Sequence, residues 1–204
     1  MKHRAAPDEL RDQAAALGVD LSPAQADALI RFEAMLLERA VPAGMVAAAD
    51  GPRLRERHLL DCLRAAAVVS ARDRTAIDLG TGAGLPGIVV AIAAPGLLVT
   101  LTELRRRRVA FLELAVEQLA LPNATVAPGR VDDLAAQADL CFARAFAPLS
   151  KAWLAAERLL VPGGRLVYFA GAGADPAFQV SHGVLEVRAT PLLESSGSLV
   201  IMTR

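Results

Sequence analysis

The sequence predicts an α/β protein of Rossmann-like type, with a mostly parallel β-sheet covered by helices on both faces. Three observations support this fold class. An apolar strand at 76–79 runs into a glycine-rich turn and then a helix, as in the first unit of a nucleotide-binding sheet. From residue 75 onward, strand patterns alternate with helical patterns. The 204 residues, 54% of them hydrophobic, suffice for one domain with a sizeable core.

The first 70 residues are expected to form a small helical extension packed on the core, which occupies residues 71–204. Ser22-Pro-Ala-Gln25 has the pattern of a capping box, with proline at the first helical position. The elements expected in this extension are a helix over 7–17, a helix from Ser22 to before Pro42, a loop over 41–52 and a helix over 53–69.

Charged residues interrupt the apolar pattern of the helix predicted over 53–69. Arg57 and Asp61 are four residues apart, so they are expected to pair on one helical face. His58 lies beside them. A solvated face is the alternative, because a single histidine is more often structural than functional.

The glycine turn after the first strand is expected to bind a ligand. Gly80, Gly82 and Gly84 let backbone N–H groups approach without a Cβ in the way, and Pro86 is expected to open the next helix. Asp78 would repel a pyrophosphate and attract a cation. S-adenosylmethionine (SAM) carries an ammonium and a sulfonium but no phosphate, so the pattern resembles motif I of SAM-dependent methyltransferases. Glycines that serve only a tight turn are the alternative.

Further candidate ligands follow the next two strands. The strand over 97–102 leads to Glu103, about twenty residues after the glycine turn, where an acid binds ribose hydroxyls. The strand over 124–127 is followed by Val131 and Asp132. The backbone of the first and the carboxylate of the second are expected to bracket an adenine edge.

The fourth strand, 139–143, delivers Arg144 to the same edge of the sheet. An arginine directly after a buried strand is unusual, so we place it in the site, with a surface arginine as the alternative. Phe146 is expected to belong to the core, and stacking on a target base is its alternative. The remaining elements are a helix over 153–160, a strand over 165–170 and an antiparallel hairpin of 184–189 with 198–203.

Four arginines, 105–108, open the helix after the second strand. Positive charge in a first turn is unfavourable against the helix macrodipole, so we interpret them as contacts for phosphate, with a solvated charge run as the alternative. The formal net charge of the chain is zero, so any RNA-binding surface must be local.

The sequence also indicates in which cellular compartment the protein is expected. Cys62 and Cys141 have no metal-binding or redox spacing, as expected for a reducing cytosol. The polar N-terminus lacks the apolar core of a signal peptide, and Pro95-Gly96 interrupts the longest apolar run. We therefore expect a cytoplasmic monomer with no membrane segment and no metal.

Five segments together resemble the bacterial 16S ribosomal RNA guanine-N7 methyltransferases, also called glucose-inhibited division protein B. They are Arg57-His-Leu-Leu-Asp-Cys62, Asp78-Leu-Gly-Thr-Gly-Ala-Gly-Leu-Pro-Gly87, Arg107-Arg-Val-Ala-Phe-Leu112, Gly129-Arg-Val-Asp-Asp133 and Ala143-Arg-Ala-Phe-Ala-Pro148. The resemblance implies a SAM-dependent methyltransferase fold. It implies an enzyme that methylates N7 of guanine 527 in 16S rRNA, in the small ribosomal subunit or an assembly intermediate.

The resemblance also implies roles for individual residues. It places cofactor contacts at Gly80, Leu85, Val131, Asp132 and Arg144. It places Arg107, Arg108 and Arg130 near RNA phosphate or the target base, and it implies that Arg57 and His58 line the site. We interpret Arg144, Arg130 and His58 as catalytic, and Arg57, Arg107 and Arg108 as RNA-binding.

Three segments depart from the family pattern, all on the expected RNA side. The loop over 41–49 lacks an Asn-Leu-Thr-type segment, Ala170 stands where members have lysine, and Ser196-Gly-Ser198 stands where they have Arg-His. Two alternatives therefore stay open: a methyltransferase with another RNA or a small-molecule substrate, and a SAM-binding module without catalysis. Asp78 and the lack of a proton relay disfavour an NAD-dependent dehydrogenase.

Overall fold

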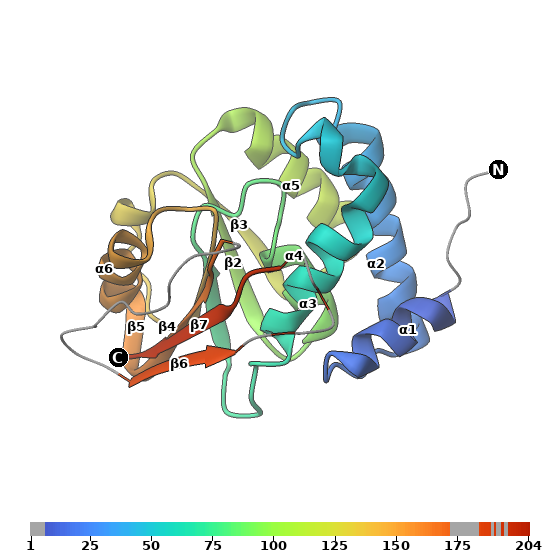
Figure 1. Cartoon of the computed structure of the whole chain (residues 1–204). Coiled ribbons are helices and arrows are strands. Elements are labelled where there is room, and N and C mark those ends of the chain that lie inside the picture. The colour runs from blue at the N-terminus through green and yellow to red at the C-terminus, as the bar shows by residue number, and fades with distance from the viewer. Residues whose placement is uncertain (1–6, 172–183, 189, 191–192, 194–195) are drawn as a thin grey trace.

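A seven-stranded β-sheet forms the centre of the protein, with helices on both of its faces (Figure 1). The structure is a computed structural model, and it describes residues 7–171, 184–188, 190, 193 and 196–204. The strands are β1 (Thr75–Asp78), β2 (Leu98–Glu103), β3 (Ala124–Pro128), β4 (Ala138–Arg144), β5 (Leu160–Phe169), β6 (Val184–Arg188) and β7 (Leu199–Thr203). Their order across the sheet is β3-β2-β1-β4-β5-β7-β6.

The first five strands pair in parallel, whereas β7 is antiparallel to both β5 and β6. β1 pairs with β2 on one side and with β4 on the other, so the direction of sheet growth reverses there. Ligands bind beyond the carboxyl ends of the strands at such a switch point. The predicted parallel sheet with an antiparallel C-terminal hairpin is confirmed. Residue Ala189 of the predicted hairpin lies outside the described residues, as do residues 1–6 of the predicted extension.

Helices separate into two layers. They are α1 (Pro7–Ala16), α2 (Pro23–Met35), α3 (Asp61–Ala66), α4 (Gly87–Ala93), α5 (Arg106–Gln118) and α6 (Leu149–Leu159), with short segments η1 (Leu36–Ala40), η2 (Ala48–Arg53), η3 (Arg55–Leu60) and η4 (Val131–Asp133). In Figure 1, α6 lies on one side of the sheet and α2, α3 and α4 lie on the other. Successive residues of β4 point to opposite faces of the sheet. Phe142 packs in the core with α4, and Cys141 packs in the core with α6.

The predicted capping box joins the N-terminal helices to the sheet. Ser22 Oγ accepts from the N–H of Gln25, and Gln25 Oε1 accepts from the N–H of Ser22. The Gln25 amide nitrogen also donates to the carbonyls of Ile92 and Ala93, at 2.9 and 3.0 Å. These carbonyls lie in the last turn of α4, where helix carbonyls lack partners within the helix. The side chain of Gln25 therefore caps the N-terminus of α2 and also satisfies carbonyls at the C-terminus of α4.

The helix after the glycine-rich turn, which is called the glycine loop from here on, begins one residue later than predicted. Pro86 is the N-cap of α4, and Gly87 is its first helical residue. The Gly87 N–H donates to Asp78 Oδ2 at 2.7 Å, which satisfies one of the free donors of the first turn. A Cβ at Gly87 would lie 2.2 Å from Leu101 Cδ2, so the helix approaches the sheet this closely only with glycine.

Candidate active site

Polar side chains from the carboxyl ends of β1, β2 and β4 meet at one edge of the sheet. Asp78 ends β1, Glu103 ends β2 and Arg144 ends β4. β1 lies between the other two, so these three side chains surround the switch point. The sequence predicted this gathering from the strand ends alone.

Asp78 is fully buried beneath the glycine loop. Its Oδ2 accepts from the Gly87 N–H at 2.7 Å and from the Thr81 hydroxyl at 2.5 Å. Its Oδ1 is buried and has no hydrogen-bond partner among the described residues. Burial raises the pKa of Asp78 to about 6, although the hydrogen bonds from Thr81 and Gly87 lower it. The unpartnered acceptor therefore fits a cationic group at this edge of the sheet.

The glycine loop is held between β1 and β2 by polar groups. The Gly80 N–H donates to Thr102 Oγ1 at 2.9 Å, and the Gly82 N–H lies 3.2 Å from Glu103 Oε2. Gly84 has a φ of +88°, and a Cβ there would lie 2.5 Å from Ile88 Cδ1. The loop thus needs glycine for its backbone conformation and for its packing on α4.

Glu103 is buried, and its carboxylate contacts both the glycine loop and the segment that begins α5. Its Oε1 accepts from the Arg105 N–H at 2.8 Å, and Arg108 Nη1 lies 3.5 Å from its Oε2. Arg108 is therefore on the glycine-loop side of the site, whereas Arg107 is exposed at the start of α5. The RNA-binding role expected for these arginines stays a prediction, and the positions favour Arg107 over Arg108 for it.

A cavity of about 210 Å³, here called the Glu103 cavity, lies beyond the ends of β1, β2 and β3. It brings together the predicted cofactor ligands Gly80, Glu103, Val131 and Asp132. Arg130, which was predicted to act on the RNA side beside Arg144, lines this cavity and not the one that contains Arg144. The Glu103 cavity also contains Leu104 and Phe146, which the sequence reasoning did not place there. Leu104 is 60% exposed, and its signal in the sequence was an apolar residue directly after a strand-end acid.

A second cavity, here called the Arg144 cavity, has a volume of about 380 Å³. The predicted residues Arg57, His58 and Arg144 line it together. Ala170 and Ser196, which belong to two of the three departing segments, line it as well. Those departures therefore change this cavity and leave the Glu103 cavity untouched.

The segment of residues 144–146 is the wall between the two cavities. Arg144 lines the Arg144 cavity and Phe146 lines the Glu103 cavity. Ala145 between them has a φ of +53°, a conformation that is uncommon for residues other than glycine. Backbone strain of this kind persists where the surrounding structure holds it and is frequent at functional sites.

Arg144 is fixed by contacts from the N-terminal helices. Its Nε donates to Asp61 Oδ2 at 3.1 Å, and its Nη2 donates to the Arg57 carbonyl at 3.0 Å and to His58 Nδ1 at 2.9 Å. Its guanidinium carbon lies 5.9 Å from the centre of the Phe169 ring. These contacts fix the direction of a planar, permanently charged group.

The predicted Arg57–Asp61 pair is wrong. Asp61 is buried, and its carboxylate pairs with Arg64 and Arg144, whereas Arg57 pairs with Asp50 at 3.1 Å. The prediction used helical spacing alone, but Arg144, which is distant in the sequence, pairs with the carboxylate of Asp61 instead, and the preceding η3 is a π-helical turn. Such turns are frequent at functional sites.

His58 has a partner on each ring nitrogen. Nδ1 lies 2.9 Å from Arg144 Nη2, and Nε2 lies 3.1 Å from Asp50 Oδ2. Burial and the charge of Arg144 lower the pKa of His58, while Asp50 and Asp61 raise it. The imidazole is therefore neutral near pH 7 and has no free nitrogen with which to take a proton from a substrate.

Neither cysteine has the setting of a nucleophile. Both thiols are free and buried, and burial raises the pKa of Cys141 to about 12. Within the described part of the chain, no group of three or more His, Cys, Asp or Glu side chains could hold a metal ion. No helix of that part has both the length and the apolar character to cross a membrane.

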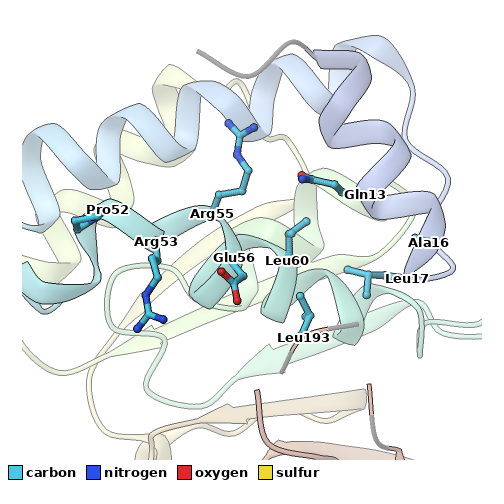
Figure 2. Close-up of a pocket in the computed structure, with 9 residues that line it drawn as sticks. All are labelled: Gln13, Ala16, Leu17, Pro52, Arg53, Arg55, Glu56, Leu60 and Leu193. Carbon is cyan, nitrogen blue, oxygen red and sulfur yellow. The ribbon is translucent and has the colours of Figure 1, made fainter. Parts of the chain in front are cut away.

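A third cavity, of about 480 Å³, lies away from the strand ends (Figure 2). Its walls are α1 and residues 52–60, with Leu193 on the sheet side. In Figure 2 the guanidinium of Arg55 points toward α2, where it pairs with Glu33. None of the predicted site residues lines this cavity.

Comparison with known proteins identifies the family. A sequence profile described as rRNA small subunit methyltransferase G (GidB) matches residues 25–187. The chain belongs to this family. The resemblance stated from the sequence is therefore confirmed.

Relatives in the family are substantially similar to this chain. Ribosomal RNA small subunit methyltransferase G of Salinispora arenicola is 40% identical over 157 residues, which cover 72% of this chain and 64% of that protein. The protein of the same name from Burkholderia thailandensis is 37% identical over 174 residues, which cover 81% and 75%. The chain thus spans less than two thirds of the length of the Salinispora relative.

Solved structures support the fold class. The TM-score is 0.58 to cofactor-bound Rv0187 from MTB, with 20% identity and 89% of each chain covered. It is 0.57 to a SAM dependent methyltransferase from Aquifex aeolicus, with 15% identity, 80% of this chain and 98% of that chain covered. The predicted Rossmann-like methyltransferase fold is confirmed.

Proposed function

We propose that this chain is a SAM-dependent enzyme that methylates N7 of guanine 527 in 16S rRNA. Membership in the rRNA small subunit methyltransferase G family supports this function. The observation that carries it within the chain is the wall of residues 144–146, which separates two adjoining cavities. One is suited to a cofactor and the other to the acceptor base.

The residues around the Glu103 cavity fit SAM. Glu103 would accept from the ribose hydroxyls, and Val131 and Asp132 would bracket the adenine edge. The glycine loop would approach the methionine part, whose ammonium the charge of Asp78 attracts. When bound, SAM supplies a methyl group on a positively charged sulfur.

The chemistry of the acceptor fits the Arg144 cavity. Guanine N7 has a lone pair and no proton, so its methylation needs no general base. His58, with both nitrogens engaged, offers none. The residues instead need to align the base with the methyl group and exclude water. Arg144 is the donor at the cavity wall that would hold the guanine O6 or the cofactor.

The test is transfer of labelled methyl from SAM to small ribosomal subunits from a strain that lacks this enzyme. We expect labelled 7-methylguanosine at about one per subunit, since a base-specific site methylates one position. Absence of label together with measured SAM binding would support one of the two alternatives: another RNA or small-molecule substrate, or a SAM-binding module without catalysis. We further propose that the chain acts as a cytoplasmic monomer on the small subunit or an assembly intermediate.

The exposed arginines at the start of α5 give a separate prediction about RNA. Replacement of Arg106 and Arg107 by alanine is expected to weaken RNA binding about tenfold and to reduce the salt slope by about two, because two phosphate contacts are lost. SAM affinity should not change. Titrations of RNA at several salt concentrations and of SAM at one measure both quantities.

A matched control removes the same charge elsewhere. Arg72 and Arg74 are exposed at the opposite edge of the sheet, just before β1. Their replacement by alanine should leave the RNA affinity and the salt slope close to those of the unmodified protein. Equal losses in the two double variants would contradict a local phosphate-binding surface.

A further inference from the structure

One carboxylate outside the predicted site contacts two residues within it. Asp50 lies in η2, in the segment that leads to the π-helical turn. Its Oδ2 is 3.1 Å from His58 Nε2, and its Oδ1 is 3.1 Å from Arg57 Nη1. Its side chain is only 16% exposed and that of His58 only 11%, so the contact between these two is shielded from water. Asp50 does not line the Arg144 cavity, yet it holds two residues that do.

The contacts determine which nitrogen of His58 carries the proton. An arginine guanidinium only donates hydrogen bonds. Because Arg144 Nη2 lies 2.9 Å from Nδ1, this nitrogen must be the acceptor and must be unprotonated. The proton of the neutral ring is then on Nε2, which donates to Asp50. The chain of contacts runs in one direction, from Arg144 through the imidazole to the carboxylate.

We propose that Asp50 is a positioning residue that aims Arg144 into its cavity through His58. The carboxylate anchors the imidazole at Nε2 and so presents the lone pair of Nδ1 to the guanidinium. Histidine ligands in metal sites are oriented by carboxylates in the same way. The consequence for methyl transfer rests on the proposed function, but the positioning itself does not.

Burial has the largest effect on the pKa of His58 and lowers it, and the charges around the ring shift it further in both directions. Arg144 faces Nδ1, Asp50 faces Nε2, Asp61 lies behind Arg144, and Arg57 shares Asp50 with the ring. Protonation of Nδ1 would place two donors against each other and release Arg144. Loss of the Asp50 charge removes a group that raises the pKa of His58, and loss of Arg144 removes a group that lowers it. The two changes should therefore move the pKa of His58 in opposite directions.

The first experiment reads the imidazole directly by ¹⁵N NMR, which distinguishes the tautomers and follows protonation with pH. The chain has only three histidines, and the signal of His58 is assigned by its loss in His58→Gln. We expect the Nε2–H tautomer at neutral pH. We also expect a lower His58 pKa in Asp50→Asn, a higher one in Arg144→Met, and a shifted Arg144 Nε–H signal in Asp50→Asn. A proton on Nδ1, or no change in Asp50→Asn, would overturn the proposal.

The second experiment measures methyl transfer by Asp50→Asn. We expect kcat to fall by up to about 100-fold, the cost of a misplaced binding group, with little change in the dissociation constant of SAM. Asp73→Asn is the matched control, because Asp73 pairs with Arg165 at the amino ends of the strands. It should lower thermal stability without moving kcat or the pKa of His58. If the unmodified protein methylates no subunit, the proposed function fails while the NMR result still decides the role of Asp50.

Discussion

Replacement of Asp78 by alanine is expected to abolish SAM binding. The change removes the acceptor for the Gly87 N–H and the Thr81 hydroxyl, and it removes the negative charge at the end of β1. These hydrogen bonds hold the glycine loop that would approach the cofactor, and the charge would attract the cofactor's cation, so an affinity loss of at least about 100-fold, or about 2.7 kcal/mol, is expected. Calorimetric titration of the folded variant with SAM measures it.

Asp78→Asn separates the charge of this side chain from its shape. The amide oxygen can still accept from Gly87 and Thr81, so the loop should keep its conformation. We expect this variant to fold and to bind SAM about tenfold or more weakly, since it lacks only the charge. Asp139→Asn is the matched control, because Asp139 accepts two backbone N–H groups at the opposite edge of the sheet. Unchanged SAM affinity in Asp78→Ala would refute the assignment of the cofactor site.

The buried setting of Asp78 also makes the affinity depend on pH. The ionised carboxylate would attract the cofactor cation, so the affinity should fall as the pH falls through about 6, the pKa of Asp78. The pKa is raised above its usual value of 3.8, so the folded protein binds more protons than the unfolded chain between these values. The cofactor-free protein should therefore lose stability as the pH rises through this interval, by about 3 kcal/mol. A bound cation offsets this loss by pairing with the charge.

Much of the site was predictable because its residues occupy positions that local patterns define. The glycine loop, Glu103 and Arg144 each follow an apolar strand, and the ends of parallel strands necessarily meet at one edge of a sheet. The capping box at Ser22 is likewise a pattern of four consecutive residues. Neither the strand-end residues nor the capping box depends on contacts between residues that are distant in the sequence.

The contacts that fix Arg144 were not predictable in this way. Asp61 and Arg144 are 83 residues apart in the chain, so no local pattern could indicate their pairing, and none marks the π-helical turn that precedes Asp61. Asp50 was missed because it lies in a 3₁₀ helix of six residues, which is too short for its periodicity to give a signal. Its only sign in the sequence was a single carboxylate in a segment rich in alanine, glycine and proline. No sequence pattern indicated the left-handed backbone conformation of Ala145.

Replacement of Arg144 by methionine is expected to lower methyl transfer more than 100-fold. The guanidinium at the wall of the cavity is the group that would hold the reacting partners, and loss of one such donor costs about 10²–10³ in kcat. Arg144→Lys should be nearly as inactive. A single ammonium cannot satisfy Asp61, the Arg57 carbonyl and His58 in the plane that the guanidinium occupies. Single-turnover methylation of small subunits measures both variants.

Arg64→Met distinguishes the loss of this function from the loss of a buried charge pair. Arg64 also pairs with the carboxylate of Asp61 and lies over the Phe169 ring, but it does not line the Arg144 cavity. Breaking a buried pair costs about 3–5 kcal/mol, so Arg64→Met and Arg144→Met should have similarly reduced thermal stability. Only Arg144→Met should lose methyl transfer when both are assayed as folded protein. Equal transfer by the two variants would mean that Arg144 stabilises the fold through Asp61 and takes no part in holding the base or the cofactor.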